Sequence, residues 1–397
     1  MNAEDFYIFR RKLKAGLESA FFYLFRPFPI KKNKIVFCAI EGSMGYACNP
    51  KYIAEEIIRQ KSGFELVWLV NDTTKIFPPE IKVVENTLIK RAFHLTTAKF
   101  WIDNSRKQLE ARKRDGQIYI QTWHAKLGFK PTCLDRGASF SKIAYLVSKH
   151  DSDMIDYVLS NSDWYDKTLP NGMLYEGKIL RSGSPRCDIL VNDSEKMRKI
   201  IRKRYKLKDN AKIIMYAPTF RGGSQGTKRA IEKGDHAPNY ERLQNALSDK
   251  FGGEWTIFLR LHPQLTARHI ASDADKNAGN IIDVSEADDM YELLAACDAF
   301  MTDYSSAAFD AAVTRMPIFL YADDYAEYEN ERGKLLWDLR NLPFPLATND
   351  NELSEQIKRF DNQKYLAKLN ELFKNTGMAE DGKAAKRVVK FIVDMKN

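Results

Sequence analysis

The regular alternation of short apolar runs with helical patterns constrains the fold of this chain more than any other feature. A first block of runs with high β-propensity lies at 34–40, 65–70, 81–85, 99–104, 117–123 and 157–162. A second block lies at 212–219, 254–263, 280–285, 299–306 and 317–323. Helical patterns lie between them, at 49–60, 87–97, 140–156, 239–250, 288–297, 306–315 and 350–360. Apolar strands alternating with helices are typical of parallel sheets covered on both faces, so the sequence predicts an α/β fold with two doubly wound, Rossmann-type domains.

The length of the chain also favours two domains, because 397 residues exceed what one core usually fills. A charged helix and turn at 193–211 separates the two blocks. We therefore expect one domain over 34–205 and a second over 206–397, with the last helix a candidate to cross back to the first.

Charge and cysteine content narrow the environment and the partners. The chain has 62 Lys and Arg against 53 Asp and Glu, a net charge of +9, which indicates an anionic partner: a phosphate-bearing substrate, an anionic membrane face or nucleic acid. Its five cysteines are scattered and form no Cys-x-x-Cys pair, which argues against a disulfide framework or a structural zinc site and favours a reducing cytoplasm. No run reaches the roughly 18 consecutive apolar residues of a membrane-spanning helix.

The segment 1–33 has the pattern of an amphipathic basic helix. Apolar residues at steps of three and four predict one helical face: Phe6, Phe9, Leu13, Leu17, Phe21, Leu24 and Phe28. Lys and Arg residues crowd the same segment, and aromatic faces edged with cations lie in the interface of anionic bilayers. We predict peripheral attachment to the membrane; the alternative is a helix that packs its apolar face on its own protein.

Polar residues follow five of the predicted strands, where ligands bind in open α/β sheets. His124 follows the run 117–123 and, taken alone, is either a catalytic base or a core histidine. The other four strand ends contribute Pro218, Thr219, Arg221, Arg260, His262, Ser285, Asp303, Ser305 and Ser306. If these strand ends converge, they line a single cleft between the two domains.

The segment 302–312 has the pattern of a phosphate site. Its strand ends at Asp303, and Ser305 and Ser306 begin a helix of small residues whose free N–H groups favour an anion. Asp310, one turn further on, is placed to bond a ribose hydroxyl or the serine hydroxyls. The alternative is that Ser305 is only a helix cap.

Four basic side chains are further candidates for phosphate contacts. Arg260 and His262 stand two apart at a strand end and so project from one face, although a buried histidine before a proline turn would have the same pattern. Arg221 precedes two glycines but lacks the lysine of a P-loop. Arg186 is predicted to be exposed in a turn, as a phosphate contact or a linker cation. No His/Asp cluster has metal-ligand spacing, so we predict neither a metal nor a cofactor.

The order of these motifs resembles the CDP-glycerol glycerophosphotransferase family, which builds teichoic acids and related capsule polymers. The motifs that carry the resemblance are LTTAKFWIDN, QTWH, GSPRCDIL, YAPTFR, LRLHP and DVSEADDMYELLAACDAFMTDYSSAAFD. The resemblance implies a GT-B-like pair of domains with an interdomain cleft, metal-independent transfer, CDP-glycerol or CDP-ribitol as the donor, and monotopic attachment to the cytoplasmic face of the membrane.

The resemblance also implies roles for residues. His124 would take the proton from the acceptor hydroxyl, whose oxygen attacks the β-phosphorus of the donor while CMP leaves, and His262 would be the second catalytic residue. Donor binding would fall to Arg186, Pro218, Thr219, Arg221, Arg260, Ser285, Asp303, Ser305, Ser306 and Asp310. After the histidine the family usually continues Gly-Thr-Pro, whereas this chain has the segment 125–128, so we expect Lys126 and Gly128 to meet the acceptor.

The sequence thus predicts an enzyme that transfers a polyol phosphate, glycerol phosphate in the first instance, to a hydroxyl of a lipid-linked acceptor. The length favours a primase-like enzyme that adds one or a few units, and a short polymerase stays open. The alternatives are a GT-B glycosyltransferase that uses a nucleotide sugar and a non-catalytic basic protein that binds membrane or nucleic acid. No nucleic-acid-binding motif is present, and the sequence predicts no oligomeric state.

Overall fold

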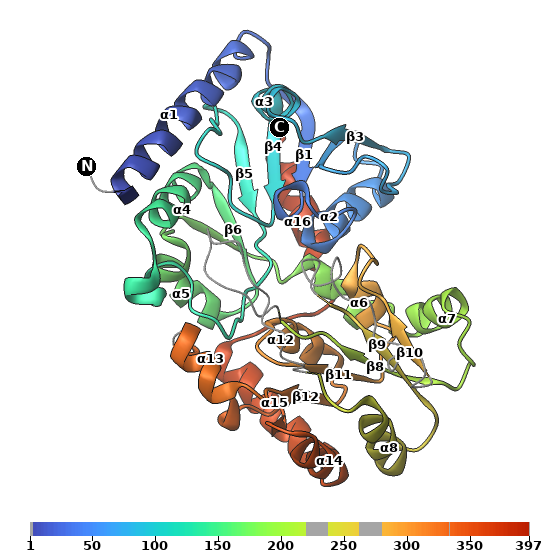
Figure 1. Ribbon diagram of the computed structural model, residues 1–397. Coiled ribbons are helices and arrows are strands. Elements are labelled where there is room, and N and C mark those ends of the chain that lie inside the picture. The colour runs from blue at the N-terminus through green and yellow to red at the C-terminus, as the bar shows by residue number, and fades with distance from the viewer. Residues whose placement is uncertain (1–2, 220–236, 262–279, 333, 397) are drawn as a thin grey trace. The chain divides into compact units, whose positions relative to one another are not determined.

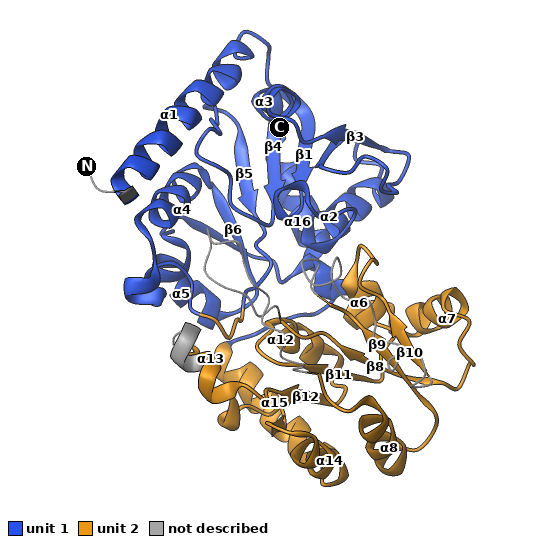
Figure 2. Ribbon diagram, in the orientation of Figure 1, with its two compact units in different colours: residues 1–126, 131–188, 377–397 blue, residues 127–130, 189–376 orange. Residues whose placement is uncertain are grey.

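The computed structural model describes residues 3–219, 237–261, 280–332 and 334–396 and divides into two compact units. Unit 1 comprises residues 1–126, 131–188 and 377–397, and unit 2 comprises 127–130 and 189–376 (Figure 2). Each unit contains one parallel sheet with helices, which confirms the predicted fold class.

The sheet of unit 1 has seven strands in the order β3-β2-β1-β4-β5-β6-β7, and every neighbouring pair is parallel (Figure 1). The strands are β1 Lys31–Cys38, β2 Glu65–Val70, β3 Ile81–Glu85, β4 Ala98–Asp103, β5 Ile118–Gln121, β6 Tyr157–Ser160 and β7 Lys178–Arg181. Its helices are α1 Ala3–Leu24, α2 Cys48–Arg59, α3 Leu88–Thr96, α4 Lys142–Met154, α5 Asp163–Met173 and α16 Ala384–Asp394, with 3-10 turns η1 Ile40–Gly42, η2 Cys133–Ser139 and η3 Pro185–Cys187.

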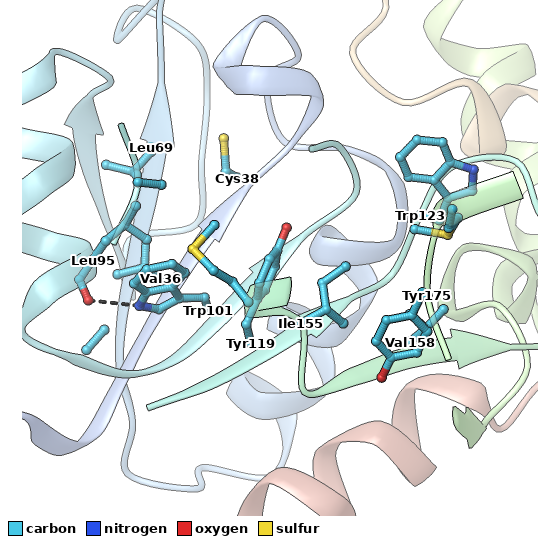
Figure 3. Packing of buried hydrophobic residues seen from close by; sticks show 14 of the residues in the cluster. Val36, Cys38, Leu69, Leu95, Trp101, Tyr119, Trp123, Ile155, Val158 and Tyr175 are labelled. Carbon is cyan, nitrogen blue, oxygen red and sulfur yellow. Dashed lines mark hydrogen bonds between the residues drawn. The ribbon is translucent and has the colours of Figure 1, made fainter. Parts of the chain in front are cut away.

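Two apolar cores cover the two faces of this sheet, because successive side chains of a strand point to opposite faces. Val36 of β1 belongs to the core that includes α3, α4 and α5, and Phe37 belongs to the core that includes α2 and α16. In the first core the indole N–H of Trp101 donates to the carbonyl of Leu95 at 2.8 Å (Figure 3). This bond satisfies the one polar group of a fully buried ring.

The sheet of unit 2 has six parallel strands in the order β10-β9-β8-β11-β12-β13. The strands are β8 Lys212–Tyr216, β9 Trp255–Leu259, β10 Ile281–Asp283, β11 Ala299–Thr302, β12 Ile318–Tyr321 and β13 Leu346–Ala347. Its helices are α6 Asp188–Asn192, α7 Ser194–Arg204, α8 Tyr240–Phe251, α11 Met290–Leu294, α12 Ala307–Ala311, α13 Tyr325–Arg332, α14 Asp350–Lys358 and α15 Asn362–Thr376, with 3-10 turns η4 Ala312–Thr314 and η5 Leu339–Asn341.

The chain enters unit 2 before the expected boundary after residue 205, and the last helix, a candidate to cross back, lies in unit 1. It enters unit 2 after residue 188, and α7 belongs there because Arg198 forms an ion pair with Asp298 at 2.6 Å. It returns at residue 377, so α16 lies in unit 1. Strands β7 and β13 had no counterpart among the predicted runs, because β7 is mostly exposed and β13 has only two residues.

Helix α1 has one buried face and one exposed apolar face. Phe22 is fully buried in the core beside α3, and Phe21, one member of the predicted apolar stripe, is partly buried against that core. The remaining members of that stripe are 50–68% exposed: Phe6, Phe9, Leu13, Leu17, Leu24 and Phe28. Among the described residues, no helix is both long and apolar enough to cross a membrane.

We predict that Phe22→Ala lowers the free energy of unfolding of unit 1 by about 3–5 kcal/mol, because it leaves a cavity in a closely packed core. Leu17→Ala on the same helix is the matched control and changes this free energy by less than about 0.5 kcal/mol, because its side chain is exposed. Urea denaturation followed by tryptophan fluorescence measures both. Equal effects of the two substitutions would contradict the packing of α1 on the core.

Candidate active site

The candidate site of unit 1 begins at Trp123, whose backbone is left-handed with φ 49°. Such a conformation is costly for a bulky residue and persists only where surrounding bonds impose it. The backbone N–H of Trp123 donates to the side-chain oxygen of Gln121 at 2.9 Å. Its carbonyl accepts from the amide of Asn49, the second residue of α2, at 2.7 Å. These bonds turn the chain sharply after β5 and set the direction of the next residue, His124.

A single hydrogen bond defines the orientation of His124. Its Nδ1 lies 2.7 Å from the carbonyl oxygen of Asn104, which follows the neighbouring strand β4. A carbonyl oxygen can only accept, so Nδ1 carries the proton and Nε2 keeps its lone pair. Asn104 is itself held, because its side-chain oxygen accepts from the backbone N–H of Ile40 at 2.7 Å. His124 therefore has the tautomer that a general base requires.

The pKa of His124 is lowered to about 4, chiefly by burial and also by the guanidinium groups of Arg186 and Arg106, against the raising effect of the hydrogen bond to Asn104. The Arg106 guanidinium lies over the Trp123 ring at 4.7 Å, and that ring lies 4.5 Å from the imidazole. The imidazole is therefore neutral at pH 7. The two cations beside it favour an anion at the same place.

Arg186 lies in unit 1 with His124, in the turn η3. Contrary to the expected exposed turn, it is 5% exposed. Its backbone N–H donates to the side-chain oxygen of Asn49 at 3.1 Å, so the same amide holds both Arg186 and Trp123. Its Nη1 lies 3.4 Å from the sulfur of Cys48. Its predicted contact with the donor stays a prediction.

The loop after His124 contributes to the protein interior. The ammonium of Lys126 donates to the carbonyl of Gly183 and the hydroxyl of Ser184, each at 3.0 Å, and the residue is 4% exposed. Nearby, Glu380 accepts from the backbone N–H of Ser184 at 2.9 Å, and burial raises the pKa of this carboxyl to about 7. Lys126 thus joins the loop to the residues around η3, a role other than the acceptor contact predicted for it.

Residues 127–130 belong to unit 2 rather than to unit 1. The carbonyl of Gly128 accepts from the indole N–H of Trp337 at 3.1 Å, and the carbonyl of Phe129 accepts from the backbone N–H of Leu336 at 2.8 Å. The Phe129 ring packs on Phe309 with centroids 4.9 Å apart. The segment after the histidine is therefore one of the places where the chain passes from one unit to the other, and the predicted acceptor contact of Gly128 stays a prediction.

In unit 2 the ends of β8 and β11 are joined by a buried carboxylate. Asp303 accepts from the backbone N–H of Thr219 at 2.9 Å and from its hydroxyl at 3.1 Å. Asp303 is 1% exposed, and its carboxylate would repel an anion placed beside Thr219. Asp303 therefore positions Thr219. Pro218, directly before Thr219, is half-buried at the end of β8.

Arg260 follows β9 and is directed into the loop after β10. Its Nη1 donates to the carbonyls of Val284 at 2.8 Å and Ala287 at 2.5 Å, and burial lowers the pKa of the guanidinium. The hydroxyl of Ser285 accepts from the backbone N–H of Leu261 at 2.8 Å. Both side chains hold the strand ends in place, and direct contact with a diphosphate stays a prediction for each.

The helix start predicted as a phosphate site is present in unit 2. Ser305 and Ser306 are half-buried directly before α12, and the Ser305 hydroxyl accepts from the N–H of Ala307 at 3.3 Å. Asp310 is buried and accepts from the phenol of Tyr291 at 2.5 Å, so its carboxylate is directed toward α11. His262 and Arg221 lie outside the described residues. Within the described ranges, no three His, Cys, Asp or Glu residues gather where they could hold a metal.

Comparison with known proteins identifies the family. The family model for CDP-Glycerol:Poly(glycerophosphate) glycerophosphotransferase matches residues 20–394. The chain belongs to this family. The resemblance of its motifs is thereby confirmed, and the GT-B-like fold with it.

Three relatives show how much of the family's architecture the chain shares. The teichoic acid poly(glycerol phosphate) polymerase of Staphylococcus epidermidis is 27% identical over 90% of this chain and 50% of the relative, so the chain spans about half of that protein. The teichoic acid glycerol-phosphate transferase of Staphylococcus aureus is 29% identical over 91% of this chain and 93% of the relative. A structure of the wall teichoic acid polymerase TagF matches with TM-score 0.81 and 25% identity, covering 100% of this chain and 99% of the other.

The sequence pattern did not predict three residues of the site: Asn49, Asn104 and Arg106. Asn104 acts through its backbone carbonyl, which leaves no signal in a side-chain pattern. Asn49 precedes a proline at the start of a predicted helix, where an asparagine is ordinarily a cap. Arg106 lies three residues after the end of β4, so the rule that ligands bind at strand ends could have found it.

We predict that His124 stays neutral down to about pH 4 in NMR titration of its ring protons. Arg106→Gln moves this titration to higher pH, because it removes a cation that disfavours the imidazolium. Since the folded pKa lies below the ordinary 6.5, this group lowers the free energy of unfolding as pH falls from 6.5 toward 4. An unchanged titration in Arg106→Gln would contradict the proximity of the two groups.

Proposed function

We propose that this protein transfers glycerol phosphate from CDP-glycerol to a hydroxyl group of a lipid-linked acceptor and releases CMP. The observation that carries the proposal is the tautomer of His124, whose Nε2 keeps its lone pair at the end of a strand. Membership of the glycerophosphotransferase family supports the same reaction. A structure of TagF soaked with CDPG supports CDP-glycerol as the donor.

The base step uses only groups of unit 1. Nε2 of His124 takes the proton of the acceptor hydroxyl while the hydroxyl oxygen bonds to the β-phosphorus, and the bond from that phosphorus to the oxygen of CMP breaks. The pKa near 4 keeps the imidazole unprotonated before the substrates bind. An anionic donor beside Arg106 and Arg186 offsets their charge and raises the pKa of the imidazole, which strengthens the base when it is needed.

Donor binding falls to unit 2 in this proposal. Phosphoryl transfer depends chiefly on positioning and on neutralising charge. Ser305 and Ser306 at the start of α12 offer hydroxyl donors to a diphosphate, while Asp303 holds Thr219 and Arg260 holds the loop after β10 in place. His262 is proposed to stabilise the leaving phosphate, as the family resemblance implies.

Attachment to the membrane is proposed for the exposed face of α1. Phe6, Phe9, Leu13 and Leu17 are exposed there. A groove of about 600 Å³ is lined by three of them, Phe6, Leu13 and Leu17, together with Arg10, Arg11 and Lys14. Apolar side chains with cations beside them match the interface of an anionic bilayer. This position would bring a lipid-linked acceptor to the enzyme.

We predict that incubation with CDP-glycerol and a lipid-linked disaccharide releases CMP and adds glycerol phosphate to the acceptor. His124→Ala lowers kcat by at least about 100-fold, because the base is lost, and changes the Kd for CDP-glycerol by no more than a few-fold. Mass spectrometry of the product and calorimetric titration of the donor measure the two effects.

Parallel incubations with CDP-ribitol and a UDP-sugar are the controls for the donor. Relatives that handle ribitol phosphate make CDP-ribitol the necessary comparison. Transfer from the UDP-sugar in place of the CDP-polyols would overturn the proposed reaction, and residual transfer near the wild-type rate in His124→Ala would overturn the role of the base.

We predict that Leu13→Glu with Leu17→Glu abolishes pelleting with vesicles that contain an anionic lipid. These side chains are 56% and 68% exposed, so the fold tolerates the change, whereas deleting residues 1–30 would also remove the buried Phe22. Lys167→Glu with Lys368→Glu, which makes a larger change in charge elsewhere, is the control and keeps vesicle binding. Undiminished pelleting of the α1 variant would remove α1 as the anchor.

A further inference from the structure

A basic groove lies on unit 1 between α2 and α16, apart from the residues of the candidate active site. It has a volume of about 620 Å³, and five of its seven lining residues are cations, with no carboxylate among the seven. The cations are Arg59, Lys383, Lys386, Arg387 and Lys390. We call these residues the α2–α16 groove. The positive charge of the groove favours an anionic ligand.

Two of the cations are available to such a ligand. Arg59, Arg387 and Lys390 each form an ion pair, with Glu56, Asp381 and Asp394 in that order. Lys383 and Lys386 are exposed, and within the described part of the chain neither ammonium has a carboxylate within 4.0 Å. The groove therefore carries two exposed ammonium groups that form no ion pair with a described residue, although the carboxylates of Glu56 and Asp381 interact electrostatically with Lys386 and Lys383. Ammonium groups on flexible stems suit phosphate groups as point charges.

The cations of α16 form one stripe. Position 383 is the N-cap of α16, and positions 386, 387 and 390 follow at i+3, i+4 and i+7, which places them on one helical face. The opposite face, with Val388, Val389 and Ile392, is buried in the core. A row of cations along one helical face matches a linear ligand that carries several negative charges.

The groove is connected to the candidate base through α2. Asn49, at the start of α2, holds Trp123 and Arg186, and Arg59 ends the same helix and lines the groove. Ten residues of helix separate them, a distance of about 15 Å. The stripe on α16 also begins near Arg186, because Asp188 accepts from the backbone N–H of Ala384 at 2.9 Å. A chain bound beside His124 can thus continue along the groove.

We propose that the α2–α16 groove binds the phosphodiester backbone of a polyol phosphate chain carried by the acceptor. This proposal rests on the proposed function for the identity of the chain. A membrane surface fits less well, because Val393 is the one apolar side chain among the described residues that line the groove, in contrast to α1. A nucleic acid fits less well too, because none of these described lining residues has an aromatic ring on which bases could stack.

The test uses a double variant, Lys383→Glu together with Lys386→Glu, which we call the groove variant. The matched control is a second double variant, Lys167→Glu together with Lys368→Glu, which reverses the charge of two exposed lysines on α5 and α15. The first measurement is binding of preformed, fluorescently labelled poly(glycerol phosphate) without any donor. The groove variant raises the Kd about tenfold or more, whereas the control stays within about twofold of wild type. The slope of log Kd against log salt falls by about 1.4 in the groove variant, because two phosphate contacts are lost.

The second measurement is transfer to acceptors of defined length. For acceptors too short to span about 15 Å from the base, the groove variant keeps the KM and kcat of wild type. For longer acceptors its KM rises by about the same factor as the Kd, with kcat unchanged. This dependence on length would not arise from a general loss of stability.

The outcomes separate the two proposals. If the wild-type protein binds the polymer and the groove variant does not, the groove proposal is supported. If the wild-type protein also transfers no glycerol phosphate, the proposed function is overturned while the groove proposal stands. Equal binding of polymer by variant and wild type overturns the groove, whatever the transfer activity. If the groove variant loses only its binding to anionic vesicles, the groove proposal is overturned in favour of lipid. If the wild-type protein binds a single-stranded oligonucleotide more tightly than the polymer, the groove proposal is overturned in favour of nucleic acid.

Discussion

The parallel pairing of β4 with β5 is the constraint on which the candidate site depends. Its register places Asp103 beside Gln121, so both strands end at the same level. The chain then continues from β4 into Asn104 and from β5 toward His124, and the Asn104 carbonyl meets the imidazole at 2.7 Å. A slip of one residue would exchange the two faces of the strand and separate these groups. The tautomer of the base is therefore a consequence of sheet register.

A buried polar network below the site keeps this geometry rigid. Asp151 of α4 accepts from the phenol of Tyr119 at 3.0 Å, and Gln121 donates to the same phenol oxygen at 2.9 Å. The side-chain oxygen of Gln121 in turn holds the backbone N–H of Trp123. Burial raises the pKa of Asp151 to about 7. Such a network is costly when any member lacks a partner, so it specifies a single arrangement of the residues before His124.

The fold was predictable because apolar runs of five to eight residues leave few alternatives to buried parallel strands. The position of His124 was predictable from the same pattern. The surroundings of His124 were not, because they depend on a backbone carbonyl of Asn104 and on the Asn49 amide, which come from other elements. Likewise, Lys126 has the pattern of an exposed loop cation, yet Gly183 and Ser184 receive its ammonium in the interior.

The sequence by itself determined the two parallel-sheet domains, the family and a histidine after the fifth strand, because hydrophobic periodicity and local motif order are properties of the chain. Only the tertiary structure decided which cations are buried, which carboxylates position loops and where the chain passes between the units. The basic stripe of α16 shows the difference: its spacing is local, but it faces a groove only because the C-terminal helix packs beside α2. Contacts between residues more than three hundred positions apart leave no signal in the local pattern.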